Sequence, residues 1–203
     1  MTDSPLQVGI TGGIGAGKSI ICKVFQSLGI PIYDADSNAK LLMTEDKDLV
    51  EAIKKNFGDE AYLSDKQLNR KFIAGKVFGN NKQLTLLNSL VHPAVGLHYK
   101  KWVESHTGKP YVIKEAALLF ESDSYKMLDK IITVEAPTNI RMNRVLFRDA
   151  HRTAKDVQAI IDNQLTDIER NKKADFVITN DDKTTVIPQV IKLHKKFTVL
   201  ALG

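Results

Sequence analysis

A glycine-rich segment near the start of the chain constrains its fold more than any other feature. Residues 12–19 read GGIGAGKS and fit the pattern G-x-x-x-x-G-K-[ST]. The apolar run Leu6 to Thr11 precedes this segment, and apolar residues at helical spacing follow it as far as Leu28. We therefore expect a buried strand, a tight loop and a helix in that order, which is the setting in which this pattern binds phosphate.

The residue types in the loop indicate how it would hold a nucleotide. Glycines let the backbone curl so that successive N–H groups converge on phosphate oxygens. Lys18 is expected to reach the β- and γ-phosphates of ATP, the Ser19 hydroxyl to bind Mg²⁺, and the Ile20 amide to contact the α-phosphate. A glycine turn that binds nothing is disfavoured, because every position of the pattern matches. The predicted loop residues for nucleotide binding are Gly13, Ile14, Gly15, Ala16, Gly17, Lys18, Ser19 and Ile20.

Further short β-branched runs occur along the chain, separated from one another by helical patterns. They are residues 30–33, 111–113, 131–134 and 176–178. Strands that alternate with helices predict an α/β fold, here a parallel five-stranded sheet with helices on both faces. In such sheets ligands bind outside the carboxyl ends of the strands.

The interval between the second and third predicted strands is too long for one crossover helix. It is rich in helix formers, and helices are expected at residues 49–57, 65–78 and 81–104. We therefore predict an inserted helical subdomain at residues 41–107. The nucleotide-binding core is then formed by residues 1–40 and 108–203.

Composition excludes several classes of protein. Lys and Arg number 29 against 24 Asp and Glu, a net charge of +5, and 43% of residues are hydrophobic, as in an ordinary globular protein. No apolar stretch is long enough for a membrane span, and residues 1–5 do not resemble a signal peptide, so no membrane partner is expected. The charge excess is smaller than nucleic-acid-binding proteins usually carry, which favours a phosphorylated small molecule over nucleic acid. The single cysteine, Cys22, favours a cytoplasmic location.

A phosphate loop is shared by kinases, GTPase switches and mechanical ATPases. A GTPase needs N-K-x-D after a strand, but residues 171–175 read NKKAD, which puts the aspartate one position late and before a strand. A small-molecule kinase is therefore favoured. The alternatives are a kinase of the same fold acting on a nucleoside monophosphate or a sugar acid, and a nucleotide-dependent switch that transfers no phosphate.

Two aspartates end the second predicted strand. Asp34 and Asp36 are two residues apart, so their side chains share one direction while the chain is extended. A carboxylate in this position can accept the proton of an acceptor hydroxyl or hold Mg²⁺-bound water. Either residue could instead cap a helix that begins near Asn38. Spacing alone does not choose between the two aspartates.

Arginines recur at helical spacing after Pro137. Arg141, Arg144 and Arg148 lie at i, i+3 and i+7, so they are expected on one face of one helix. Such a cationic face can close over a nucleotide and neutralise the transferred phosphoryl group. The alternative is a solvated helix whose arginines pair with Asp149 and Glu135.

Taken together, these segments resemble the dephospho-CoA kinase family over nearly the whole chain. The resemblance implies a P-loop kinase core, a helical acceptor-binding (CoA) subdomain and a helical lid at about residues 138–170. It also implies transfer of the ATP γ-phosphate to the ribose 3′-hydroxyl of dephospho-CoA, giving coenzyme A and ADP. The matching segments are ITGGIGAGKS at 10–19, GIPIYDADSNAK at 29–40, the pair His92-Pro93, EAALLFES at 115–122, RMNRVLFRD at 141–149 and ADFVITND at 174–181.

The resemblance also implies individual roles. Asp36 matches the family's catalytic base and Arg144 its lid arginine, and with Lys18 they form the predicted catalytic set. Further nucleotide contacts are expected from Arg141, Arg148 and Asn180, the last in the loop against the adenine. The acceptor side is expected to include Asp34, His92, Leu118 and Phe120.

Several positions keep two interpretations. His92-Pro93 equally fits a turn that breaks a helix, and Glu115 either reaches the ligand or solvates the end of a strand. The chain departs from many relatives at Ile20, where a backbone amide suffices, and at Ala117, which bears on the path of the loop after the third strand.

Overall fold

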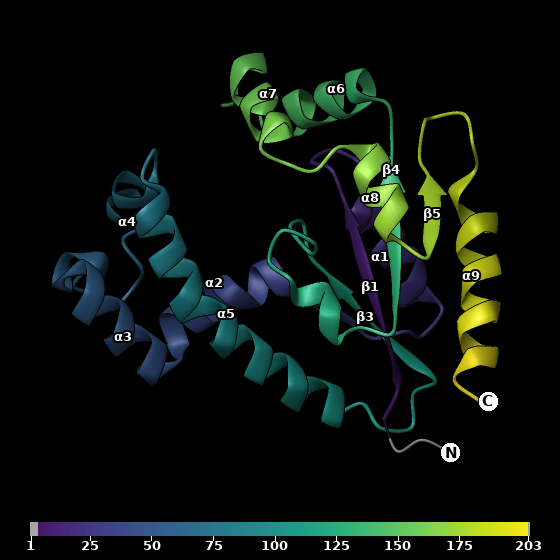
Figure 1. The fold of residues 1–203 in the computed structure, drawn as a ribbon, viewed down its shortest axis with the longest axis horizontal. Helices are drawn as coiled ribbons and strands as arrows, with labels where there is room; N and C mark the ends of the chain where they lie inside the picture. The colour runs from purple at the N-terminus through teal and green to yellow at the C-terminus, as the bar shows by residue number, and fades with distance from the viewer. Residues whose placement is uncertain (1–3, 203) are drawn as a thin grey trace. The chain divides into compact units, whose positions relative to one another are not determined.

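The structure is a computed structural model that describes residues 4–202 (Figure 1). The chain divides into two compact units. The first consists of the chain up to Asp34 and from His106 onward, and the second is Ala35–Ser105. The sequence places the first division after Lys40, but helix α2 (Ala35–Glu45) begins directly after strand β2 (Ile32–Asp34), so the division falls between Asp34 and Ala35.

Five strands form one parallel sheet within the described part of the first unit, which confirms the predicted α/β sheet. The order is β2-β3-β1-β4-β5, and every neighbouring pair is parallel. β1 therefore lies between β3 and β4, and its carboxyl end opens at the point where the strand order reverses, where ligands of such sheets bind. Besides β2, the strands are β1 (Leu6–Gly12), β3 (Tyr111–Glu115), β4 (Lys130–Glu135) and β5 (Phe176–Thr179).

Helices cover both faces of this sheet, as predicted. On one face α1 (Lys18–Ser27) and α9 (Val186–Leu200) pack against each other and against the strands. The Tyr111 ring lies 6.3 Å from that of Phe25 and 5.4 Å from that of Phe197, which joins both helices to β3. Truncating such a buried aromatic side chain costs about 3–5 kcal/mol of stability. On the other face α8 (Asp167–Lys173) packs on β4, and η2 (Ser124–Met127) follows β3.

The segment after β4 folds into further short helices. α6 (Thr138–Arg148) and α7 (Ala154–Asp162) lie beyond the carboxyl ends of the central strands, and α8 returns to the sheet (Figure 1). α7 and α8 each begin with a capping box, in which Thr153 and Thr166 exchange hydrogen bonds with the N3 acid. Residues 138–170, the predicted lid, lie in this segment, and their closure over a ligand stays a prediction.

The second unit is helical. Its long helix α5 (Asn81–Glu104) contacts α2, α3 (Lys47–Phe57) and α4 (Arg70–Val77), and the short η1 (Asp59–Ala61) joins α3 to the chain before α4. The predicted helix at residues 65–78 starts only at Arg70, because the Asn69 side chain accepts a hydrogen bond from the Phe72 amide and so begins the helix there.

α5 continues through Pro93, which confirms the predicted helix at residues 81–104 and excludes the alternative of a helix-breaking turn at His92-Pro93. Proline removes one backbone donor and crowds the preceding turn, which destabilises an isolated helix. Val91, Val95, Tyr99 and Val103 are buried at four-residue intervals along α5, and this packing outweighs the local cost. His92 is exposed on the same helix.

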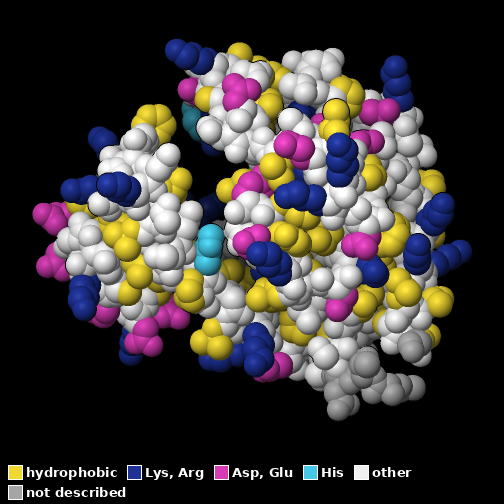
Figure 2. Space-filling view, in the orientation of Figure 1, with side chains coloured by type: hydrophobic (Ala, Val, Ile, Leu, Met, Phe, Trp, Pro, Cys, Tyr) yellow, Lys and Arg dark blue, Asp and Glu magenta, His cyan; other side chains and the backbone are white. Residues whose placement is uncertain are grey.

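Charged side chains of both signs are interspersed on the face shown in Figure 2. This distribution agrees with the small net charge of +5. No helix among residues 4–202 is both long enough and apolar enough to cross a membrane.

Candidate active site

Residues 12–19 form the predicted loop between β1 and α1. Gly17 is the N-cap residue of α1 and has φ 94°, a conformation that favours glycine. A Cβ atom at Gly17 would also overlap the Asn180 side-chain amide, so both backbone and packing require glycine there. The Ala16 amide donates to the Gly13 carbonyl at 3.1 Å, which closes the turn. The loop thus presents the start of α1, with its positive end, to a ligand.

Lys18 lies over this loop. Its Nζ donates to the Gly12 carbonyl oxygen at 2.9 Å, so the ammonium group stays at the loop rather than in solvent. A phosphate bound at the loop would meet this cation.

One side of the loop carries carboxylates, and we call Ser19, Asp34 and Glu115 the acidic flank. The Ser19 hydroxyl donates to Glu115 Oε1 at 3.1 Å. Asp34 and Glu115 are register partners at the ends of β2 and β3, so they lie side by side on neighbouring strands. Glu115 therefore lies beside the phosphate loop, and its contact with a ligand stays a prediction.

The acidic flank also perturbs Cys22 behind the loop. Burial raises the pKa of the Cys22 thiol, and the charge of Glu115 and a hydrogen bond to it raise the pKa further, while Lys18 opposes them. The thiol is free and buried, as expected for a core residue.

The structure corrects the geometric argument for Asp34 and Asp36. Asp34 ends β2, but Ala35 already belongs to α2, so Asp36 lies in the first turn of a helix rather than on an extended chain. The two side chains are therefore not related by strand alternation. Asp34 is half-buried in the first unit, whereas Asp36 is exposed in the second. The role of Asp36 as catalytic base stays a prediction.

Arginines occupy another side of the loop, and we call Arg141, Arg144 and Arg170 the cationic flank. Arg141 is 4% exposed, and its Nε donates to the Ala136 carbonyl at 3.0 Å. A Cβ atom at Gly13 would overlap the Arg141 guanidinium, so glycine is what allows this approach. Burial lowers the pKa of Arg141, Asp167 opposes that effect and the charge of Arg170 adds to it.

Arg144 reaches the loop through its guanidinium group. Nη1 contacts the Gly15 carbonyl at 3.4 Å, and Nη2 donates to the Asn180 carbonyl at 3.0 Å and pairs with Asp182. Arg144 therefore ties α6 to both the loop and the end of β5.

Arg141, Arg144 and Arg148 lie on one helix, as predicted, but the Arg148 guanidinium group does not join the other two at the loop. The Arg148 side chain is 65% exposed and pairs with Asp149 at 2.8 Å. Glu135, the other carboxylate considered as a partner, instead binds Asn171 and Thr179. Arg141 and Arg144 lie against the loop, whereas Arg148 is solvent-exposed and pairs with Asp149, as in the alternative of a solvated helix. A contact of Arg148 with a nucleotide stays a prediction.

Asn180 braces the loop from the carboxyl end of β5. Its Nδ2 donates to the Ala16 carbonyl at 2.8 Å, and the side chain is buried. The observed contact is thus with the phosphate loop, and the predicted position against an adenine stays a prediction.

Two residues of the site were missed at the level of sequence. Gln164 Oε1 accepts a hydrogen bond from the Ile14 amide at 2.9 Å, and Arg170 Nη2 lies 3.0 Å from where a Cβ of Gly13 would stand. Both follow α7, far along the chain from the loop they contact. Neither stands at a spacing that marks a motif, so only the folded chain brings them to the loop.

The residues predicted to contact the acceptor are divided between the two units. Leu118 is 49% exposed, whereas Phe120 is buried, with its ring 5.3 Å from that of Tyr125 and Lys173 Nζ over it. Phe120 therefore packs in the first unit, and His92 lies on α5 of the second. Their contacts with an acceptor stay predictions.

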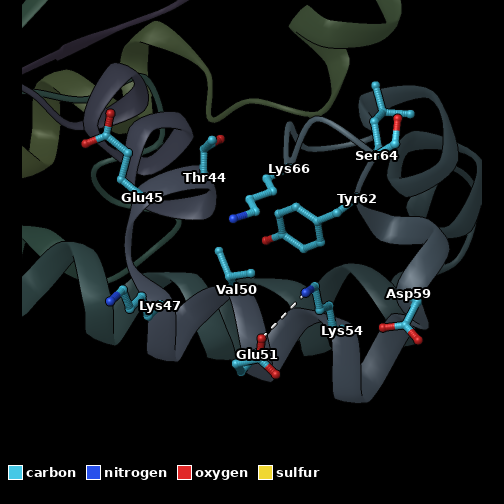
Figure 3. A pocket seen from close by; sticks show the side chains of 11 residues that line it. Thr44, Glu45, Lys47, Val50, Glu51, Lys54, Asp59, Tyr62, Ser64 and Lys66 are labelled. Atoms are coloured by element: carbon cyan, nitrogen blue, oxygen red, sulfur yellow. Dashed lines mark ion pairs between the residues drawn. The ribbon is translucent and has the colours of Figure 1, made fainter.

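The second unit contains a cavity of its own, about 670 Å³ in volume, between α2, α3 and η1 (Figure 3). Tyr62 and Lys66 point into it above Val50, and an ion pair joins Lys54 to Glu51. Acids and lysines are equally represented in its lining, so it has no preference for one sign of charge. The charged lining residues are Glu45, Lys47, Glu51, Lys54, Asp59 and Lys66.

Comparison with known proteins decides the family. A sequence profile of dephospho-CoA kinase matches residues 6–185. The chain belongs to the dephospho-CoA kinase family. A dephospho-CoA kinase from Colwellia psychrerythraea is 33% identical over 97% of this chain and 98% of its own length.

Solved structures agree with membership in the dephospho-CoA kinase family. The crystal structure of TT1252 from Thermus thermophilus superposes with a TM-score of 0.81 at 31% identity, covering 98% of this chain and 97% of that one. The dephospho-CoA kinase from Campylobacter jejuni gives a TM-score of 0.68 at 25% identity, covering 95% and 96%. The family resemblance drawn from the sequence motifs is thereby confirmed.

Proposed function

We propose that this chain phosphorylates the ribose 3′-hydroxyl of dephospho-CoA with ATP, yielding coenzyme A and ADP, the last step of coenzyme A biosynthesis. The observation that carries the proposal is the family match over residues 6–185, which includes a complete phosphate loop. The folded loop supports it, because Lys18, Arg141 and Arg144 all lie against the loop backbone.

Phosphate binding follows from the loop and the cationic flank. Backbone amides at the start of α1 donate hydrogen bonds to the phosphate oxygens. Lys18 exchanges its hydrogen bond to the Gly12 carbonyl for contacts with the β- and γ-phosphates. Arg144 and Arg141 add positive charge where negative charge shifts during transfer, at positions fixed before the reaction. Their backbone contacts hold both arginines in place, so little reorganisation is needed.

The acidic flank fits a Mg²⁺ ion that accompanies ATP. Ser19 and Glu115 are hydrogen-bonded to each other, and Asp34 ends the neighbouring strand, so a hydroxyl and two carboxylates share this edge of the sheet. Mg²⁺ prefers oxygen ligands and takes the rest from water and phosphate. Ser19 would bind the ion, and Glu115 and Asp34 would hold its water. The ion would neutralise charge on the phosphates.

The acceptor step requires a base. Asp36 accepts the proton of the 3′-hydroxyl as the hydroxyl oxygen bonds to the γ-phosphorus. The bond between the γ-phosphorus and the β–γ bridging oxygen breaks at the same time, and ADP leaves. Asp36 is exposed in the first turn of α2, two residues after Asp34 of the acidic flank. The helical second unit is assigned to acceptor binding, and the proposed location is the cytoplasm.

The test is turnover with defined acceptors. The purified chain with MgATP should convert dephospho-CoA to coenzyme A and ADP in equal amounts, and shikimate, nucleoside monophosphates and sugar acids should give no comparable product. Steady ATP hydrolysis that no acceptor changes would instead indicate a nucleotide switch.

A further inference from the structure

Two buried arginines share one carboxylate beside the phosphate loop. Arg170, in α8, is 2% exposed and pairs with Asp167 Oδ1 through Nη2. Arg141, in α6, is 4% exposed and lies 3.4 Å from Asp167 Oδ2. Two cations and one anion leave a net charge of +1 in this cluster. A buried charge without a counter-charge is costly, so the cluster favours the arrival of an anion.

Arg170 also keeps an unused donor. Its Nη1 donates to the Leu165 carbonyl and its Nη2 to Asp167, but its Nε is buried and has no hydrogen-bond partner within residues 4–202. Buried guanidinium donors are normally satisfied, so the unsatisfied Nε is a second sign that the charge of Arg170 is incompletely compensated.

The cluster lies on the ligand side of the loop. Gln164, which leads into α8, accepts the hydrogen bond of the Ile14 amide, one of the donors expected to face phosphate. Arg170 Nη2 is 3.0 Å from the position of a Cβ on Gly13, and the Arg141 guanidinium approaches the same point. Gln164 and Arg170 therefore lie against the loop at Ile14 and Gly13.

We propose that Arg170 is a second buried phosphate-binding arginine of this site, whose charge serves the terminal phosphates of the nucleotide. The inference rests on the proposed function only in taking a nucleoside triphosphate as the ligand. Asp167 holds Arg170 and Arg141 at a fixed separation and neutralises one of the two charges. The second positive charge is available to the nucleotide. It should strengthen binding only of phosphates that reach Gly13 and Ile14.

A charge-only change tests this role. Arg170→Gln removes the charge and keeps a polar amide group, and Arg170→Lys keeps the charge. Lys172→Gln makes the same charge change at an exposed position of α8. Affinities for ATP and AMP are measured by calorimetric titration without acceptor, together with thermal melting. Arg170→Gln should weaken ATP binding by about tenfold or more and AMP binding by less than about twofold. Arg170→Lys should stay within about threefold of wild type for both nucleotides, and Lys172→Gln should match wild type.

Equal losses for ATP and AMP, or unchanged ATP affinity, in a folded Arg170→Gln protein would show that Arg170 only supports the fold. Should that variant not fold, Arg170→Lys decides: ATP binding weakened by more than about tenfold would overturn the proposal. If the variants show the expected changes in ATP affinity but the wild-type protein does not phosphorylate dephospho-CoA, the proposed function is contradicted and the role of Arg170 stands.

Discussion

The two flanks of the phosphate loop differ in charge and in how they are built. The acidic flank comes from neighbouring strand ends, where register fixes Asp34 beside Glu115. The cationic flank comes from α6 and α8, whose arginines reach the loop through tertiary packing. A carboxylate pair next to Ser19 suits a cation, whereas buried guanidinium groups at Gly13 suit an anion. MgATP, the proposed substrate, carries both kinds of charge, so we expect the difference between the flanks to orient it on the loop.

Removing the charge at the centre of the loop should have the largest effect, because Lys18 is proposed to neutralise the phosphates on which both flanks are proposed to act. Lys18→Ala should lower kcat by at least about a thousandfold with little change in thermal stability. Steady-state kinetics and melting curves check this, with Lys23→Ala, exposed on the same helix, as the control. Near-normal kcat in a folded Lys18→Ala protein would remove the loop from the mechanism.

Neutralising the predicted base should cost less. Asp36→Asn should lower kcat by about a hundredfold while ATP affinity stays nearly constant, because only the proton acceptor is lost. Asp34→Asn should mainly raise the Mg²⁺ concentration needed for activity. Kinetics of the two variants compared directly decide the assignment. A larger loss of kcat at Asp34 would transfer the base to the acidic flank.

On the cationic flank, Arg144→Ala should lower kcat by about ten- to a hundredfold and raise the KM for ATP less, because its charge acts mostly in the transition state. Arg144→Lys should recover only part of the loss, since an ammonium group cannot contact Gly15 and Asn180 together. Asp182→Asn is the control for the exposed ion pair and should change kcat little. Unchanged kinetics in Arg144→Ala would make the arginine merely structural.

Glu115→Gln should shift the Mg²⁺ dependence rather than abolish turnover. The concentration of Mg²⁺ at half-maximal activity should rise by about tenfold, because the amide keeps the Ser19 contact but not the charge. A titration of activity against Mg²⁺ at saturating ATP measures this, with Glu104→Gln, exposed at the end of α5, as the control. An unchanged Mg²⁺ dependence would separate the acidic flank from the metal.

The smallest effect concerns Cys22. Since its pKa is raised in the folded protein, the native state keeps the thiol proton at a pH where the unfolded chain, with a pKa near 9.0, loses it. The free energy of unfolding should therefore fall between about pH 8 and about pH 10, and fall less in Cys22→Ala. Urea denaturation at both pH values measures the difference. Parallel pH profiles for the two proteins would contradict the burial argument.

The sequence assigned two residues of each flank to the site, Ser19 and Asp34 on the acidic flank and Arg141 and Arg144 on the cationic flank; it left Glu115 open and missed Arg170. Ser19, Asp34 and Glu115 each stand next to a strand or in a motif, so their position follows from local pattern and parallel pairing. Arg170 and Gln164 reach the loop only because α8 folds back on β4, and no residue spacing records that contact.

Other differences between local pattern and structure have the same origin. Helical spacing predicts three arginines on one face of α6. In the structure Arg141 and Arg144 pack against the loop, whereas Arg148 is exposed and pairs with Asp149. At Pro93 a turn was an open alternative to the predicted helix, and the packing of α5 favours the helix. Local rules thus located the strands and the loop, while tertiary packing decided which polar side chains reach the ligand.

The central claim is that the loop with its two flanks transfers a phosphoryl group to dephospho-CoA. The most direct measurement supplies the purified chain with MgATP carrying a labelled γ-phosphate and follows the label by phosphorus NMR. The account predicts that the label appears as the 3′-phosphate of coenzyme A, with one ADP formed for each, and that Lys18→Ala forms neither. Label released only as inorganic phosphate, with dephospho-CoA unchanged, would contradict it.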